Sequence, residues 1–184
     1  IYGGTYNLFG VTMKKMGIEC TFVDQDLPLE ELVKFIKPNT KAVFAETITN
    51  PTVKVLDFEK FSHVAKRAGV PLVVDNTFPT PFLCRPFDFG ADIVTHSTTK
   101  YMDGHDASVG GCIVDSGKFD WFAHADKFPG LTTPDESYHG VVYAEKFGLE
   151  GAFITKATAQ LMRDLGSIQA PMNAYLINLG LESL

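Results

Sequence analysis

The sequence has 184 residues, of which 45% are hydrophobic, and a formal net charge of −6 at pH 7. This length is sufficient for one domain with a full core, and an acidic chain without a basic cluster is unlike a nucleic-acid-binding protein. No apolar run reaches membrane-spanning length, and the three isolated cysteines form neither a CxxC pair nor a disulfide framework.

The first half of the chain alternates between two hydrophobic periodicities. Helical spacing after the glycine turn at Gly3 and Gly4 predicts a helix that stops at Gly17. Further helices are predicted from Pro28 to just before Pro38, and from an Asp57 cap to Gly69. Short apolar or alternating runs predict strands, at residues 19–24, 41–46, 71–75, 92–95 and 111–115. The second half is more helical, with one long amphipathic helix over 149–165 and another from about 172 to 184.

This order of elements predicts an α/β fold, with a mostly parallel sheet covered by helices on both faces, in a single domain over residues 1–184. Right-handed crossovers would place the carboxyl end of every strand at one edge of the sheet. Open α/β sheets bind ligands at that edge, so residues that follow strands are the first candidates for a site.

The strongest candidate is Lys100, which follows the strand at 92–95 and precedes a glycine-rich loop. A lysine there is suited to forming a Schiff base with a carbonyl, and the hydroxyls of Ser97 and Thr99 are suited to holding a phosphate. Asp75 ends an apolar strand, where a buried carboxylate needs a cation or hydrogen-bond donors. Each of these residues also has an ordinary interpretation, as a solvated lysine or a turn residue.

Pyridoxal phosphate (PLP) connects these residues, since it requires five kinds of contact. It needs a lysine, an anion near its ring nitrogen, a donor to its phenolic oxygen, a phosphate cradle and an aromatic ring to stack on. The chain offers a candidate for each: Lys100, Asp75, Asn50, Ser97 with Thr99, and Tyr2. The histidines and cysteines show no spacing typical of a metal site.

Three segments resemble the Cys/Met-metabolism family of fold-type-I PLP-dependent enzymes: Tyr2–Phe9, Val73–Thr77 and Ser97–Lys100. Three others are most similar to the O-acetylhomoserine sulfhydrylases of that family: Asp115–Trp121, Phe128–His139 and Ala152–Ala157. The resemblance covers essentially the whole chain. It implies the large, PLP-binding domain of the fold-type-I transferases.

The resemblance also implies a role for each candidate residue. Lys100 would form the Schiff base and then move protons at the α and β carbons of the substrate. The other residues would contact the cofactor: Asp75 at the pyridinium nitrogen, Asn50 at the phenolic oxygen, Ser97 and Thr99 at the phosphate, and Tyr2 by stacking on the ring. Tyr2 would also help in proton transfer.

The implied reaction is γ-replacement on O-acetylhomoserine. Sulfide or a thiol replaces acetate, which gives homocysteine or methionine. Methionine γ-lyase and cystathionine γ-synthase are alternatives with the same cofactor, although Gly4 stands where the γ-lyases carry a cysteine. A non-catalytic fragment is an alternative of another class. A nucleotide-binding Rossmann domain fits less well, because no G-x-G-x-x-G follows the first strand.

The beginning and end of the sequence predict an incomplete domain, because both lie within segments typical of a domain interior. The resemblance implies an upstream phosphate-binding turn, an N-terminal segment and a C-terminal domain that holds the substrate carboxylate. We therefore expect the 184 residues alone to turn over substrate poorly. The resemblance further implies a cytoplasmic homo-oligomer, a tetramer in the family, with small-molecule substrates and without nucleic-acid or membrane partners.

Overall fold

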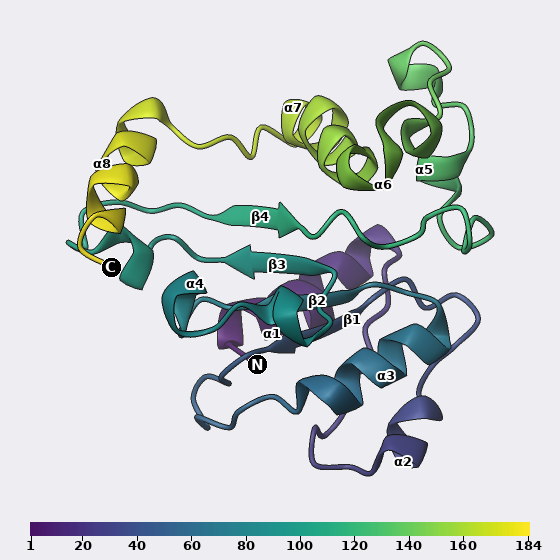
Figure 1. The fold of residues 1–184 in the computed structure, drawn as a ribbon, viewed down its shortest axis with the longest axis horizontal. Helices are drawn as coiled ribbons and strands as arrows, with labels where there is room; N and C mark the ends of the chain where they lie inside the picture. Colours follow the sequence, from purple (N-terminus) through teal and green to yellow (C-terminus); the bar gives the residue numbers. More distant parts are fainter.

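The computed structural model describes residues 1–184 (Figure 1). Four strands form one sheet: β1 (Val43–Glu46), β2 (Leu72–Asp75), β3 (Ile93–His96) and β4 (Cys112–Asp115). The α-helices are α1 (Gly3–Asn7), α2 (Leu29–Val33), α3 (Phe58–Ala68), α4 (Thr80–Leu83), α5 (Pro129–Thr132), α6 (Tyr143–Lys156), α7 (Arg163–Leu165) and α8 (Pro171–Leu181). Shorter turns of 3-10 or π type are η1 (Leu8–Thr12), η2 (Met13–Met16), η3 (Pro86–Phe89), η4 (Tyr101–Asp103), η5 (Glu136–Tyr138) and η6 (Ala157–Met162).

The sheet has the strand order β1-β2-β3-β4, and its first three strands are parallel. This confirms the predicted mostly parallel α/β fold. The expectation that every strand ends at the same edge is wrong for β4, which runs antiparallel to β3 with His96 opposite Cys112. The connection between β3 and β4 contains only the short η4 and no crossover helix, so the chain turns back at the edge where β3 ends.

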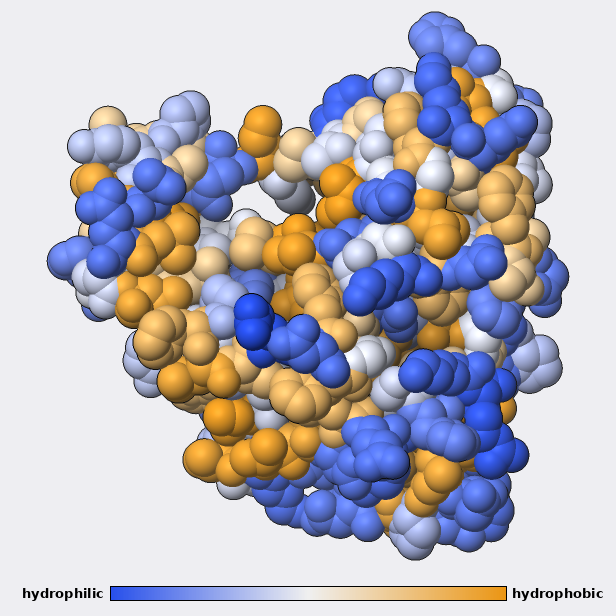
Figure 2. Space-filling view, in the orientation of Figure 1, coloured by the Kyte–Doolittle hydropathy of each residue, from blue (hydrophilic) through white to orange (hydrophobic).

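Helices cover both faces of the sheet, and their outer surfaces differ. In the view of Figure 2, the surface over α2 and α3 at the lower right is mostly hydrophilic, whereas hydrophobic side chains gather at the left, between α8 and α4. No helix combines the length and the apolar character that crossing a lipid bilayer requires.

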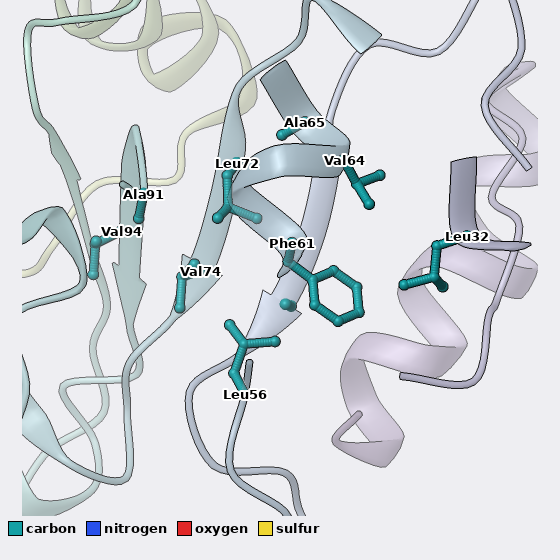
Figure 3. Packing of buried hydrophobic residues seen from close by; sticks show 10 residues of the cluster. Leu32, Leu56, Phe61, Val64, Ala65, Leu72, Val74, Ala91 and Val94 are labelled. Atoms are coloured by element: carbon teal, nitrogen blue, oxygen red, sulfur yellow. The ribbon is translucent and has the colours of Figure 1, made fainter. Parts of the chain in front are cut away.

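The first face of the sheet packs against α3 and α2 (Figure 3). Its core consists of buried aliphatic residues and one phenylalanine: Leu32, Leu56, Phe61, Val64, Ala65, Leu72, Val74, Ala91 and Val94, with Ala45. The second face packs against α6 and the loop before it through Ile93, Trp121 and Tyr143. The N-terminal helix lies against this face as well, since the rings of Phe9 and Phe44 meet edge to face at 5.0 Å.

Helix α3 forms where the sequence predicts it because both ends carry local signals. Asp57 Oδ1 accepts a hydrogen bond from the backbone N–H of Lys60 at 3.0 Å, which caps the amino end. Gly69 ends the helix with φ of +62°, a conformation that favours glycine. This crossover between β1 and β2 fixes their parallel alignment and brings their carboxyl ends together.

Several predicted elements differ from the structure. Residues 19–24 pair with no strand; Phe22 instead stacks on Tyr6 at 4.5 Å, so the alternation reflects packing against the N-terminal helix. The helix expected up to Pro38 ends at Val33. The helix predicted over 149–165 is confirmed, because the chain is continuously helical from the kink at Gly148 through the end of α6, the π-type η6 and α7. The last predicted helix is confirmed as α8.

Candidate functional site

A cavity of about 1000 Å³ opens at the carboxyl edge of β1, β2 and β3. All of the residues singled out from the sequence line it: Tyr2, Asn50, Asp75, Ser97, Thr99 and Lys100. They come from the start of the chain, from the last residue of β2 and from the segments that follow β1 and β3. A second, smaller cavity of about 270 Å³, between the N-terminal helix and residues 19–22, contains none of them.

Lys100 presents a free amine to the cavity. It follows β3 by four residues and is exposed. No hydrogen bond or ion pair joins its Nζ to another residue of the chain. An amine that is not engaged by a carboxylate remains available as a nucleophile once it loses its proton.

Asp75 and Ser97 are joined through the hydroxyl of Thr77. Asp75 Oδ1 accepts hydrogen bonds from the Thr77 backbone N–H at 2.9 Å and from the Thr77 hydroxyl. The same hydroxyl accepts a hydrogen bond from the Ser97 N–H at 2.8 Å. Asp75 Oδ2 has no partner within the protein, so one carboxylate oxygen remains available for a cationic N–H group in the cavity.

The two hydroxyls expected to hold a phosphate differ in their bonding. Thr99 Oγ1 donates a hydrogen bond to the carbonyl of Gly110 at 3.1 Å and accepts one from its N–H at 3.0 Å. The Ser97 hydroxyl makes no hydrogen bond within the chain. Ser97 is therefore free to donate to a ligand, whereas Thr99 would have to release the Gly110 carbonyl first.

Asn50 and Tyr2 are held through their backbones by one carboxylate. Glu46 Oε1 accepts a hydrogen bond from the Tyr2 N–H at 2.6 Å, and Oε2 accepts one from the Asn50 N–H at 3.1 Å. The Asn50 side chain makes no hydrogen bond within the chain, and the Tyr2 side chain is exposed. Gly4 lies beside the Tyr2 ring, where a Cβ would come within 2.7 Å of Cε1.

The loop after Lys100 is organised by a buried carboxylate. Asp103 has no exposed surface, and it accepts hydrogen bonds from the Ser108 hydroxyl at 2.7 Å and the Ala107 N–H at 2.6 Å. The Ser108 bond, followed by the Ala107 bond, lowers the pKa of Asp103 below its usual value. The charged carboxylate thus holds the loop that brings Asp106 to the cavity.

His96, which precedes Ser97, is a core residue and does not line the cavity. Burial lowers the pKa of its imidazole, although the charge of Asp75 opposes this effect. The imidazole is therefore neutral at pH 7, as expected for a packed strand histidine.

Two residues at the cavity were missed in the sequence. Glu46 carries the same signal that singled out Asp75, since it is an acid at the end of an apolar strand. Thr77 lies two residues after Asp75, a spacing at which an aspartate commonly bonds the backbone in a turn. Both side chains act on the predicted residues through hydrogen bonds.

The donor set fits pyridoxal phosphate. One cavity contains a free amine, a carboxylate oxygen without a partner, a free hydroxyl, a free amide and an exposed phenol ring. These are the groups that would meet its aldehyde, ring nitrogen, phosphate, phenolic oxygen and ring face.

Comparisons with known proteins indicate the same cofactor. The family model described as "Cys/Met metabolism PLP-dependent enzyme" matches residues 1–184. A homocysteine/cysteine synthase from Kluyveromyces lactis is 49% identical over 185 residues, and the match covers 100% of this chain and 41% of the relative. An O-acetyl-L-homoserine sulfhydrylase from Leptospira meyeri is 48% identical over 191 residues, covering 100% of this chain and 42% of the relative.

Among solved structures, the fold matches one from Campylobacter jejuni that is described as an O-acetylhomoserine (thiol)-lyase. The TM-score is 0.92 at 38% sequence identity, and the match covers 100% of this chain and 44% of the other. That structure contains a lysine bonded to pyridoxyl phosphate. The present chain thus spans about two fifths of the length of these relatives.

Proposed function

The chain belongs to the Cys/Met-metabolism family of PLP-dependent enzymes, and on that basis we propose that it catalyses γ-replacement on O-acetylhomoserine. In this reaction the Cγ–O bond of the substrate breaks, acetate leaves, and sulfide or a thiol forms a new Cγ–S bond. The product is homocysteine with sulfide and methionine with methanethiol. The names of the relatives from Leptospira meyeri and Campylobacter jejuni support this substrate.

The observation that carries the proposal is the position of Lys100 in the cavity, together with Asp75, Asn50 and Ser97. When bound, pyridoxal phosphate supplies an aldehyde that condenses with amines and a ring that stabilises a carbanion. Lys100 would hold the cofactor covalently through Nζ. The Ser97 hydroxyl would donate to phosphate, and the Asn50 amide would donate to the phenolic oxygen.

Asp75 would keep the ring nitrogen protonated. Its Oδ2 has no partner in the chain, and its Oδ1 is fixed by Thr77, so the carboxylate has a defined direction. An anion next to a protonated nitrogen stabilises the charged form of that nitrogen. Tyr2 would stack on the ring. Thr99 would donate a hydrogen bond to the phosphate after its hydroxyl releases the carbonyl of Gly110.

Lys100 would also move the protons that the reaction requires. Once its Nζ is released by the amino group of the substrate, it is a free base beside the substrate's α and β carbons. A single amine that takes a proton at one carbon and returns it at another serves as base and acid in turn.

We further propose that residues 1–184 act as one PLP-binding domain within a cytoplasmic homo-oligomer. The exposed apolar side chains near the cavity support association: Phe82 is 77% exposed and Leu83 is 76% exposed, both on α4. A surface of this kind is typical of protein–protein contacts. Light scattering on the purified protein would give the oligomeric state.

The proposed reaction is tested by supplying O-acetylhomoserine with and without sulfide. We expect equal amounts of acetate and homocysteine with sulfide, and loss of both products in Lys100→Ala. Formation of 2-oxobutyrate without a nucleophile would indicate a γ-lyase instead. Because the 184 residues alone are expected to turn over substrate poorly, the assay uses a protein of the length of the relatives that contains this chain. Absence of acetate release from that protein when it carries the cofactor would contradict the proposal.

A further inference from the structure

Glu46 is a buried carboxylate at the end of β1 whose only partners are two backbone N–H groups. Glu46 is 5% exposed, and no lysine, arginine or histidine forms an ion pair with its carboxylate. Oε1 accepts the hydrogen bond from Tyr2 at 2.6 Å, and Oε2 accepts the one from Asn50 at 3.1 Å. A buried anion is stable only when donors satisfy it, so these two bonds account for its presence there.

The two donors belong to segments far apart in the sequence. Tyr2 is 44 residues from Glu46 and directly precedes α1, whereas Asn50 lies in the turn that follows β1. Neither N–H makes a hydrogen bond within a helix or a strand. The Glu46 carboxylate therefore ties both segments to the rigid end of a sheet strand.

Building on the proposed function, we infer that Glu46 is a positioning residue that sets Tyr2 and Asn50 against the cofactor. Its two oxygens fix the backbone at two places, so the phenol ring and the amide are held at the cavity before any ligand arrives. Catalytic groups must be held within fractions of an ångström, and loop residues need such support. Glu46 itself touches neither cofactor nor substrate in this role.

Only a glutamate provides both contacts. In Glu46→Gln the shape is kept, but the amide nitrogen is a donor and would face one of the two backbone N–H groups. One of the two bonds is then lost. Aspartate is shorter by one methylene group, so it cannot reach the two donors from the same backbone position.

The test compares Glu46→Gln with Glu59→Gln, which makes the same chemical change at an exposed position in the first turn of α3. The first measurement is amide hydrogen exchange without cofactor. We expect exchange at Asn50 or Tyr2 to be about ten- to a hundredfold faster in Glu46→Gln and unchanged in Glu59→Gln. Unchanged exchange at both amides in Glu46→Gln would overturn the inference.

The second measurement is the pH midpoint of the visible absorbance band with pyridoxal phosphate on Lys100. A donor to the phenolic oxygen stabilises its negative charge most when the neighbouring Schiff-base proton has left. Loss of the Asn50 contact should therefore raise the midpoint. We expect Glu46→Gln to raise the pH midpoint, as Asn50→Ala does. The midpoint of the double variant should be no higher than that of Asn50→Ala alone.

The outcomes separate the inference from the proposed function. A midpoint that moves in Asn50→Ala but not in Glu46→Gln overturns the positioning role alone. If borohydride reduction attaches no pyridoxyl group to Lys100 in the unmodified protein, the proposed function fails and this role fails with it. A melting temperature of Glu46→Gln within a few degrees of that of Glu59→Gln would show that the spectral change is not general unfolding.

Discussion

The hydroxyl of Thr77 donates a hydrogen bond to the Asp75 carboxylate, which ends the strand two residues earlier. The same hydroxyl accepts the backbone N–H of Ser97 at 2.8 Å. One side chain therefore links the end of β2 to the segment that leads from β3 to Lys100. This relationship fixes the candidate anion and the candidate phosphate donor relative to each other.

Replacing Thr77 with valine removes this link while keeping the shape of the side chain. We expect pyridoxal phosphate to bind about tenfold more weakly, since one hydrogen bond to a charged group is lost on the Asp75 side. A fluorescence titration with the cofactor measures the change. Thr158→Val, at an exposed position of η6, is the control. Equal affinities in the two variants would contradict the proposed link.

Asn76 supports the same edge from inside the core. It has no exposed surface, accepts a hydrogen bond from the Thr47 hydroxyl at 2.8 Å, and donates to the carbonyls of Thr80 at 3.1 Å and Cys84 at 2.8 Å. Asn76→Asp should lower the free energy of unfolding by about 2–4 kcal/mol, because a carboxylate cannot donate to those carbonyls. Urea denaturation tests this.

The control for that experiment is Asn178→Asp, at an exposed position of α8, which should change the free energy of unfolding by less than about 0.5 kcal/mol. If the two variants unfold at the same urea concentration, the buried network around Asn76 does not stabilise the fold.

Asp135 makes the stability of the folded chain depend on pH in the acidic range. Its ion pair with Lys156, aided by Ser137, lowers the pKa of Asp135 to about 2. The pKa of Asp135 is lower in the folded state than in the unfolded chain. The ion pair therefore stabilises the fold fully above the pKa of the unfolded state, and this stabilisation is lost as the pH falls from about 4 to 2. Lys156→Met should remove about 1–2 kcal/mol at pH 7. Its stability should also change less between pH 4 and pH 2, as followed by thermal unfolding at each pH.

A methyl group at Gly4 should disturb Tyr2 without harming the helix. A Cβ there would lie 2.7 Å from Tyr2 Cε1, so the flexible ring must move. Alanine is a better helix former than glycine, so the melting temperature of Gly4→Ala should not fall. Turnover should fall about three- to tenfold as the ring loses its position over the cofactor. Full activity in this variant would argue against the stacking role of Tyr2.

The elements that the sequence predicted well carry their signals locally. Asp57 and Gly69 define α3 from either end, and the apolar runs before Asp75 and Ser97 are buried strands. The predicted strand at 19–24 failed because alternation gives no information about the partner, and here Phe22 packs on Tyr6. The direction of β4 was missed for a similar reason, since it depends on how the connecting loop turns back.

The site was predicted from chemistry more than from spacing, and its supporting residues were not. Lys100 and Asp75, which we propose to contact the cofactor, are recognisable by the groups they carry at strand ends, and both line the cavity. Glu46 and Thr77 act on backbone N–H groups and a neighbouring carboxylate, and such contacts depend on the folded geometry. The hydrogen bond that already engages the Thr99 hydroxyl likewise could not be predicted from the sequence.

The most direct test of the account is to add pyridoxal phosphate to the purified protein, reduce it with borohydride and map the modified peptide. Lys100 is the lysine that lines the cavity with Asp75 and Asn50, so we predict a visible absorbance band and a pyridoxyl group on Lys100. The band should be lost in Lys100→Ala. A stable modification on another lysine, or none on Lys100 in folded protein, would contradict the assignment of this cavity as the cofactor site.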